Sequence, residues 1–563
     1  MPYTAKPLEK PTGCRSAHAL LGSSTRMGPI EEGQTLRKEP SIQDRGAGSV
    51  AQLFVDAARC WPGIRCVEDE RDALTFAEVL QRARSLAGTL VRAGVRPDDR
   101  VALWMATSVD WYVADVAISM AGAVMVPVNA QLRPDEVRHV LRQTRAAAVV
   151  MDGQMGDVDA NAVISGDFGV VDGWTGPRMV VVRGGVPRGA SAWSTAINSA
   201  PLHECVPREL DAAAYVLFTS GTTSLPKGVL LTHRNVLTVA RNVAAQMGWA
   251  PGERNLCAVP FYSSYGAVTN ILGAMWAGAT TVCAAKFSAR SVLDALGAGA
   301  VDSMVGVDTM YRDLVALCEV SSDEIPRHLR SAVCVPVSGR LVTDIKRHLH
   351  AEEVYSGYGL TEASACSALA LVPDDGGDDL DLAALGGVRF RVVDPVTLRP
   401  VAVGETGELQ ISGETIMGGY EREPEETART LVDGWLRTGD LAEAVDNRGT
   451  VRFRGRSKDV IKSAGFTISA AEVERVLELH PDVVHAALIG VPDLRLTEVA
   501  VAYVVSRHDA EPSVEDLRAF CGERLARYKV PRRFIFLEEL PLTGTGKVQK
   551  AALRKATLPA DPS

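Results

Sequence analysis

The chain has 563 residues, 46% hydrophobic and 23% charged, which is ordinary for a soluble globular protein and too long for one compact core. Its formal net charge of -9 argues against nucleic acid as the main partner, because a phosphate backbone calls for a basic surface. The 10 cysteines form neither a CxxC pair nor a cluster with histidine, which argues against a metal–thiolate site or a disulfide framework and favours the cytoplasm.

The first 47 residues are rich in Gly, Pro, Ser and charge with little periodicity, so we expect a disordered tail over residues 1–47. We find neither a membrane-length apolar run nor a secretory signal pattern. Apolar runs then alternate with amphipathic stretches, as in parallel sheets with helices on both faces. The predicted helices are 76–93 and 111–121, and the predicted strands are 101–105, 124–128, 212–218, 280–284, 331–336 and 354–356.

After about residue 407 the sequence pattern changes to short strands separated by turn residues, which indicates a small β-rich subdomain. A polar joint at 454–459 precedes a last α+β segment, in which Ser513 and Asp516 are placed to form a capping box. We therefore expect an N-terminal domain over 48–455 and a C-terminal domain over 456–563. The predicted elements here are strands 409–411, 441–445, 450–453, 484–491 and 498–505 and helix 471–479.

The segment between the predicted strand 212–218 and the next apolar run is rich in hydroxyl and glycine residues and ends in a lysine. Backbone N–H groups, hydroxyls and a cation in one glycine-containing loop suit a polyphosphate. It is not a Walker A loop, because proline precedes the lysine and no Ser or Thr follows it. The loop reads Thr219-Ser220-Gly221-Thr222-Thr223-Ser224-Leu225-Pro226-Lys227-Gly228.

Further segments carry residues suited to a nucleotide. Tyr358 can stack on a purine, and Glu362 is a natural Mg²⁺ ligand beside a phosphate loop. Asp440 can accept hydrogen bonds from ribose hydroxyls, and Lys547 stands on a glycine-flexible loop. Each residue alone also fits a structural role, as core packing, a helix cap or a surface lysine. Their combination, in this order and spacing, favours a functional site.

These motifs resemble the adenylate-forming superfamily of acyl-CoA synthetases, carrier-loading adenylation domains and luciferases. The resemblance covers roughly residues 50–555 and includes the early runs 74–78 and 121–129. It implies an α/β fold with a large N-terminal domain of mostly parallel sheets, a small mobile C-terminal domain and an active site between them. It also implies that the C-terminal domain rotates about a hinge between two half-reactions.

The resemblance implies a role for each matching residue. The residues that would bind the ATP phosphates are Thr219, Ser220, Gly221, Thr222, Thr223 and Lys227. At the adenine site, Tyr358 would stack on the base and Gly359 would line the pocket. Gly339 is included among the nucleotide-binding residues. The remaining roles are Thr361 on the α-phosphate, Glu362 on Mg²⁺, Asp440 and Arg456 on the ribose, Lys458 at the hinge, and Lys547 on the α-phosphate and the substrate oxyanion.

The departures from the family pattern gather at the acyl pocket, which we assign to Tyr262, Ser263, Tyr265, Asp308 and Arg340. Ser263 stands where histidine is usual, Asp308 where proline is usual, and Arg340 in place of a small residue. If both charges face the pocket, they favour a small polar or doubly charged acid over a long fatty chain, since Arg340 could bind a second carboxylate. Alternatively, Asp308 and Arg340 pair with each other or face solvent.

The leading hypothesis is an ATP- and Mg²⁺-dependent ligase that converts a small polar or aromatic acid to an acyl-AMP and transfers it to coenzyme A. Alternatives stay open: transfer to a carrier-protein thiol or an amine, or activation of nitrite to diazotise an aromatic amine. A nucleotide-binding scaffold without activity is the non-enzyme alternative. The retention of Lys227, Glu362, Asp440, Arg456 and Lys547 together argues against that scaffold.

Overall fold

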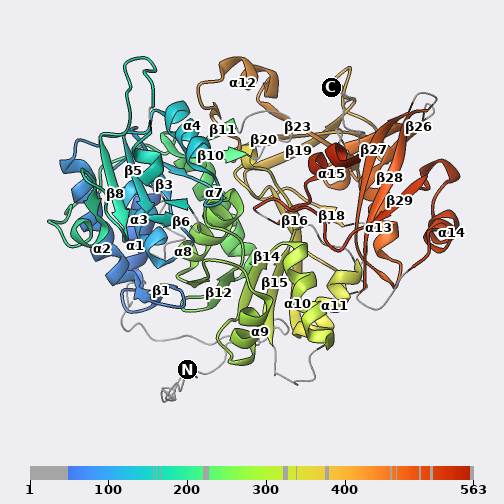
Figure 1. Ribbon diagram of the computed structural model, residues 1–563, viewed down its shortest axis with the longest axis horizontal. Helices are drawn as coiled ribbons and strands as arrows, with labels where there is room; N and C mark the ends of the chain where they lie inside the picture. Colours follow the sequence, from blue (N-terminus) through green and yellow to red (C-terminus); the bar gives the residue numbers. More distant parts are fainter. Residues whose placement is uncertain are drawn as a thin grey trace, which may run out of the picture. The chain divides into compact units, whose positions relative to one another are not determined.

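The computed structural model describes most of the chain from residue 48 to residue 557 (Figure 1). The predicted tail, residues 1–47, lies outside the described residues. The described ranges are 48–155, 158–159, 161–166, 168–219, 227–320, 328–335, 337, 339–374, 380–456, 459–463, 466–493, 496–507, 512–544 and 546–557.

The first large sheet is parallel in its interior and antiparallel at both edges. Its strand order is β17-β16-β15-β14-β12-β13-β1-β2, and the antiparallel pairs are β16 with β17 and β1 with β2. A parallel interior with apolar strands needs helices on both faces. The strands are β1 (Arg65–Glu68), β2 (Ala73–Thr75), β12 (Arg254–Cys257), β13 (Thr280–Cys283), β14 (Ser303–Gly306), β15 (Leu329–Cys334), β16 (Ala351–Tyr358) and β17 (Ala368–Leu371).

The second large sheet has the order β21-β11-β10-β4-β3-β5-β8-β9. In it β11 is antiparallel to both of its neighbours, β10 and β21, and the remaining pairs are parallel. Successive β3 residues belong to two different cores, one on each face, which explains its uninterrupted apolar sequence. The strands are β3 (Arg100–Trp104), β4 (Val124–Pro127), β5 (Ala148–Asp152), β8 (Met179–Arg183), β9 (Ser191–Ala192), β10 (Ala213–Thr219), β11 (Lys227–Thr232) and β21 (Gly419–Tyr420); the separate ribbon β6 (Gln154–Met155) and β7 (Val158–Asp159) follows β5.

Helices join the two sheets into one core and cover their outer faces. The helix α3 contacts β3 and β4 of the second sheet and β1 of the first, while α7 contacts β10 and β11 and packs on η2 and α8. The helices are α1 (Val50–Cys60), α2 (Phe76–Arg92), α3 (Val109–Met120), α4 (Pro134–Thr144), α5 (Asn161–Ile164), α6 (Trp193–Ala196), α7 (His233–Met247), η2 (Tyr265–Leu272), α8 (Gly273–Ala277), α9 (Ala289–Gly297), α10 (Asp308–Val320), α11 (Gly339–Leu349) and α12 (Pro424–Thr430).

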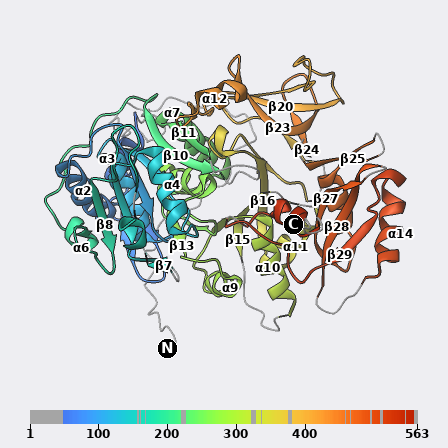
Figure 2. The ribbon, with the colours of Figure 1, turned by 45° about the horizontal axis from the view of Figure 1, so that its top comes forward.

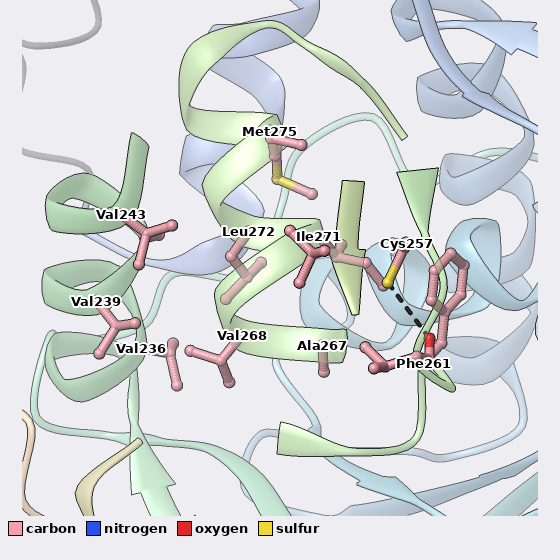
Figure 3. Packing of buried hydrophobic residues seen from close by; sticks show 14 of the residues in the cluster. Val236, Val239, Val243, Cys257, Phe261, Ala267, Val268, Ile271, Leu272 and Met275 are labelled. Atoms are coloured by element: carbon pink, nitrogen blue, oxygen red, sulfur yellow. Dashed lines mark hydrogen bonds between the residues drawn. The ribbon is translucent and has the colours of Figure 1, made fainter. Parts of the chain in front are cut away.

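The packing of α7 illustrates how sequence spacing builds this core. Val236, Val239 and Val243 recur every three or four residues and so share one face of the helix. Figure 3 shows these side chains directed toward Val268 and Leu272 of η2. The π-helical segment η2 begins at the predicted pocket residue Tyr265, so its packing against α7 fixes one wall of the candidate site.

Two smaller sheets form the last third of the chain (Figure 2). The third sheet, β18-β24-β23-β20-β19 with β22 on β23, is antiparallel; the fourth has the order β26-β25-β28-β27, with β29 parallel to β28. The third contains β18 (Asp381–Leu382), β19 (Val388–Val393), β20 (Thr406–Gly413), β22 (Leu431–Val432), β23 (Trp435–Ala444) and β24 (Val451–Arg456). The fourth contains β25 (Val460–Ser463), β26 (Phe466–Ser469), β27 (Val483–Asp493), β28 (Thr497–Ser506) and β29 (Arg533–Phe536), with α13 (Ala470–Glu478), α14 (Val514–Arg524), η5 (Arg527–Lys529) and α15 (Lys550–Thr557).

This architecture confirms the predicted α/β fold with its β-rich subdomain and its C-terminal α+β segment. One local detail differs from expectation. Ser513 caps α14 by accepting from the Asp516 amide at 3.1 Å, but the Asp516 carboxylate bonds His480 Nε2 at 3.1 Å. The domain boundary proposed at residue 456 stays a prediction, since residues 457–458 lie outside the described range.

Candidate active site

The predicted phosphate loop connects two antiparallel strands. Thr219 ends β10, Lys227 begins β11, and the two residues face each other in the strand register. The register fixes the distance between the two ends of the loop. The intervening candidates Ser220, Gly221, Thr222 and Thr223 lie outside the described residues.

Lys227 and Glu362 both contact one tyrosine, Tyr420. Lys227 Nζ is 2.5 Å from Glu426 Oε1 and 5.3 Å from the ring centroid of Tyr420. The Tyr420 hydroxyl donates to Glu362 Oε1 at 2.9 Å. Burial, and then the Glu362 carboxylate, raise the pKa of Tyr420, so the phenol stays a neutral donor. The arrangement holds a cation and a carboxylate beside the end of the phosphate loop.

The turn after β16 brings a hydroxyl and this carboxylate together. A Cβ atom at Gly359 would lie 1.8 Å from the Ala365 carbonyl oxygen, so only glycine permits the turn. Thr361 and Glu362 follow in the short helix η3 (Thr361–Ala363). The Thr361 hydroxyl lies 3.1 Å from that of Ser264, which precedes η2. The two hydroxyls thereby connect the predicted α-phosphate residue to the predicted acyl pocket.

Three further candidates form one hydrogen-bonded group. The Tyr358 hydroxyl donates to Asp440 Oδ2 at 2.7 Å, and Arg456 Nε lies 3.5 Å from Asp440 Oδ1, because Asp440 and Arg456 are paired between β23 and β24. The Tyr358 ring centroid lies 5.6 Å from that of Phe453. Burial, and then Asp440, raise the pKa of Tyr358 well above its ordinary value. The structure therefore brings the predicted adenine and ribose residues together.

The C-terminal loop that carries Lys547 lies against the N-terminal part of the chain. The Tyr262 hydroxyl donates to the Gly544 carbonyl at 3.1 Å, and the Thr309 hydroxyl donates to the Gly546 carbonyl at 3.2 Å. Gly546 has a φ of 82°, a conformation that favours glycine. The loop thus reaches segments 282 and 237 residues earlier in the sequence.

Lys547 lies among the charges of the nucleotide candidates. Its side chain remains accessible to solvent. Partial loss of water contact, and then the positive charge of Arg456, lower the pKa of Lys547, while Asp440 and Asp308 partly offset this effect. The residue chosen from the C-terminal motif is therefore electrostatically coupled to the predicted ribose pair and to a predicted pocket residue.

Asp308 belongs to a charged cluster between α10 and the C-terminal segment. Its carboxylate lies 3.9 Å from Arg312 Nε, one helical turn later. Arg312 also donates to Glu478 Oε2 at 2.7 Å and to the Val484 carbonyl at 2.9 Å. His485 Nδ1 lies 3.2 Å from Glu478 Oε1. Burial raises the pKa of Asp308, although His485 and Arg312 partly offset it.

Arg340 has partners other than Asp308. Its Nη1 atom donates to the His480 carbonyl at 3.0 Å and to the Glu478 carbonyl at 3.4 Å. The structure therefore contains neither of the two predicted alternatives, an Asp308–Arg340 pair or a guanidinium that faces only solvent. Arg340 instead binds main-chain carbonyls at the end of α13. Gly339 is the first residue of α11, next to this contact.

The other pocket candidates line the start of η2. The Ser263 hydroxyl donates to the Pro260 carbonyl at 2.8 Å and accepts from the Gly266 amide at 3.0 Å, so it stabilises the turn at the position where histidine is usual. The Tyr265 hydroxyl is buried without a hydrogen-bond partner among the described residues. Burial raises the pKa of Tyr262 to about 12, which keeps that phenol protonated.

Some residues of this region were missed by sequence reasoning. Tyr420 and Glu426 contact Lys227, yet the only local signal was a tyrosine next to two glycines. Arg312 and Glu478 are 166 residues apart, and their pairing has no local signal at all. The predicted hinge residue Lys458 lies outside the described residues.

Two family models match the chain over the regions that build this site. The model of the AMP-binding enzyme matches residues 54–421, and that of the AMP-binding enzyme C-terminal domain matches residues 472–547. The chain belongs to the AMP-binding enzyme family. Both large sheets lie entirely within the first match, and Lys547 is the last residue of the second match.

Curated relatives and solved structures agree with this membership. This AMP-binding enzyme is 32% identical over 515 residues to a methyl-dioxo-octahydroindenyl-propanoyl:CoA ligase of Rhodococcus jostii, covering 89% of this chain and 97% of the relative. It is 33% identical over 521 residues to a feruloyl-CoA synthase of an Amycolatopsis species, covering 91% and 99%. ATP-bound MatB from Rhodopseudomonas palustris is 27% identical with a TM-score of 0.78, covering 90% and 98%.

These matches confirm the predicted superfamily and the prediction of an AMP-forming ligase. Among the described residues, no helix combines the length and the apolar character needed to cross a membrane.

Proposed function

We propose that this AMP-binding enzyme activates a small aromatic or polar carboxylic acid as an acyl-AMP and then transfers the acyl group to the thiol of coenzyme A. One observation carries the proposal. The loop that carries Lys547 accepts hydrogen bonds from Tyr262 and Thr309, which places it against the N-terminal region. Lys547 is there electrostatically coupled to Asp308 and to the strand pair of Asp440 and Arg456. A mobile cation beside a nucleotide site is what a two-step adenylating enzyme needs.

The first half-reaction joins two anions. The acid carboxylate forms a bond to the α-phosphorus of ATP, and the bond from that phosphorus to the pyrophosphate oxygen breaks. Lys547 would stabilise the charge on the α-phosphoryl and carboxylate oxygens, and Lys227 that on the departing pyrophosphate. Asp440 and Arg456 would hold the ribose, and Tyr358 the adenine. Thr361 would donate to the α-phosphate.

The donor set fits Mg²⁺ held mainly by the nucleotide. The described residues contain no group of three or more His, Cys, Asp or Glu side chains able to hold a metal ion. Mg²⁺ is usually bound by one or two carboxylates together with substrate phosphates, so a single carboxylate is sufficient. Glu362, oriented by the Tyr420 hydroxyl, would be that ligand, and the ion would neutralise phosphate charge when bound.

The contacts of the charged candidates refine the substrate class. Arg340 is bound to main-chain carbonyls and Asp308 lies beside Arg312, so neither charge is available to define a doubly charged acid in this arrangement. Tyr265 offers a buried phenol whose hydroxyl has no hydrogen-bond partner among the described residues. Two curated relatives are named for acids that carry a ring system. These points favour a ring-bearing acid over a dicarboxylic or long-chain acid.

Acid-dependent exchange of pyrophosphate into ATP tests the first step. The panel holds cinnamic and benzoic acids, a dicarboxylic acid and a long-chain fatty acid, with nitrite plus an arylamine as a separate arm. We expect exchange with a ring-bearing acid and product formation when coenzyme A is added. If product forms only with a carrier protein or an amine, that molecule and not coenzyme A is the acyl acceptor. If only nitrite supports activity, the enzyme activates nitrite and not a carboxylic acid. Pyrophosphate exchange under no condition would contradict the proposal.

A further inference from the structure

Two side-chain hydroxyls of the N-terminal region bind the loop before Lys547. Tyr262 lies between β12 and η2, and Thr309 lies in the first turn of α10. Their hydroxyls donate to the carbonyls of Gly544 and Gly546, at 3.1 Å and 3.2 Å. We call this pair of contacts the hydroxyl clamp. Gly546 directly precedes Lys547 and Gly544 lies three residues before it, so the clamp fixes the loop that carries the lysine.

The loop fits the clamp closely because both of its contact residues are glycines. A Cβ atom at Gly544 would lie 2.8 Å from the Tyr262 hydroxyl oxygen and 2.4 Å from Gln131 Oε1. At Gly546 it would lie 3.1 Å from Thr309 Oγ1. A side chain at either position would therefore hold the backbone away from the donors. The glycines that make the loop flexible also permit this close approach.

The chemistry of the contacts suits reversible docking. Each contact is a neutral hydroxyl donating to a backbone carbonyl, a bond of modest net strength that water replaces readily. The Tyr262 phenol stays protonated, because its burial moves its pKa to about 12. The charge of Lys547 is not used by the clamp, since the contacts involve main-chain carbonyls only. The lysine remains available to the nucleotide site.

We propose that Tyr262 and Thr309 are positioning residues that hold the C-terminal loop, and with it Lys547, in place for acyl-AMP formation and release it for acyl transfer. This inference rests on the proposed function. It reassigns Tyr262 from the wall of the acyl pocket to the docking of the C-terminal loop. It also predicts that the clamp acts on only one of the two half-reactions.

The test compares the two half-reactions in variants that remove each hydroxyl. Tyr262→Phe and Thr309→Val delete one donor each, whereas Thr309→Ser keeps the hydroxyl and removes only the methyl group. Tyr355→Phe is the matched control, because its hydroxyl bonds Glu353 in β16. We expect pyrophosphate exchange to fall about two- to tenfold for each deletion and further in the double variant. The KM values for ATP and acid should change little. Pyrophosphate exchange in Thr309→Ser should stay close to the wild-type rate.

The second half-reaction starts from a synthetic acyl-adenylate and coenzyme A, which bypasses Lys547. We expect its rate in the double variant to equal or exceed that of the wild type. Equal losses in both half-reactions would indicate a merely structural role and overturn the proposal, as would unchanged exchange in all variants.

A second readout separates this inference from the proposed function. Hydrogen–deuterium exchange of the peptide spanning residues 540–550 reports docking of the loop without any catalysis. We expect faster deuterium uptake in the double variant than in the wild type or in Tyr355→Phe. If the wild type adenylates no acid but this difference is present, the proposed function fails and the clamp stands. If uptake is unchanged, the clamp is wrong.

Discussion

The ion pair between Arg312 and Glu478 joins the two family-matched regions, so its removal should weaken their contact. The two side chains are 13% and 15% exposed, and their charged atoms are 2.7 Å apart. Breaking a buried pair by removing one partner costs about 3 to 5 kcal/mol. We expect the lower end, about 3 kcal/mol, because Glu478 keeps its contacts with His485 Nδ1 and the Ala486 amide.

A loss of about 3 kcal/mol corresponds to roughly a 150-fold change in an equilibrium constant. Arg312→Leu should therefore reduce pyrophosphate exchange by up to about 100-fold, because the docked arrangement that carries Lys547 is less populated. Transfer from a synthetic acyl-adenylate to coenzyme A should be much less affected. Circular dichroism and thermal unfolding of the variant establish that it is folded.

A double-mutant cycle isolates the pair. Glu478→Gln leaves Arg312 without its carboxylate, while the double variant removes both charges. The double variant should lose less than the sum of the single variants by at least about 1 kcal/mol, since neither Arg312 nor Glu478 then leaves the other's buried charge unpaired. Additivity within about 0.5 kcal/mol would refute the argument that these residues act as a pair.

Two further predictions concern buried and metal-binding carboxylates. Burial raises the pKa of Asp115 to about 7, only partly offset by the hydrogen bond from the Tyr215 hydroxyl, so the folded protein prefers the neutral acid and loses stability as pH rises from about 4 to about 7. Asp115→Asn removes this loss and should raise the free energy of unfolding by about 4 kcal/mol at pH 8 but little at pH 4; urea unfolding at both pH values measures it, and an equal gain at both would contradict the reasoning. Glu362→Gln should raise the Mg²⁺ concentration for half-maximal pyrophosphate exchange by about tenfold or more, since a charged ligand is lost. An unchanged Mg²⁺ titration curve would remove Glu362 from the metal site.

The contribution of the Arg312–Glu478 pair to the stability of the wild-type protein should depend on pH. Burial alone would raise the pKa of Glu478, but Arg312 and then His485 outweigh it, so the net shift is downward. A lowered carboxyl pKa stabilises the fold at pH values above the unfolded value, and this contribution is lost as pH falls through the folded value. The contact is therefore weakened only in acid.

Local patterns allowed much of the fold to be predicted. The helix α2 was predicted within one residue of its bounds, because its apolar residues share one face. The structure adds a capping box of Thr75 and Glu78 at its start. Strands with two covered faces were found as uninterrupted apolar runs. The nucleotide candidates Tyr358, Asp440 and Arg456 were chosen from separate motifs, and the structure brings them together.

The pocket charges could not be placed from sequence. Asp308 and Arg340 stood out as departures, but their partners depend on how α10 and α11 meet the C-terminal segment. Arg340 meets a carbonyl 140 residues later, and Tyr262 meets one 282 residues later. No periodicity or local propensity encodes such contacts. Tertiary packing decided them.

The central claim is that Lys547 completes an adenylating site. The most direct measurement compares pyrophosphate exchange and ATP binding in the wild type and in Lys547→Ala with the acid found active in the panel. We expect exchange to fall at least about 100-fold, because a cation at the reacting phosphoryl group is lost, while the Kd for ATP changes less than about threefold. Exchange at the wild-type rate in Lys547→Ala would contradict it.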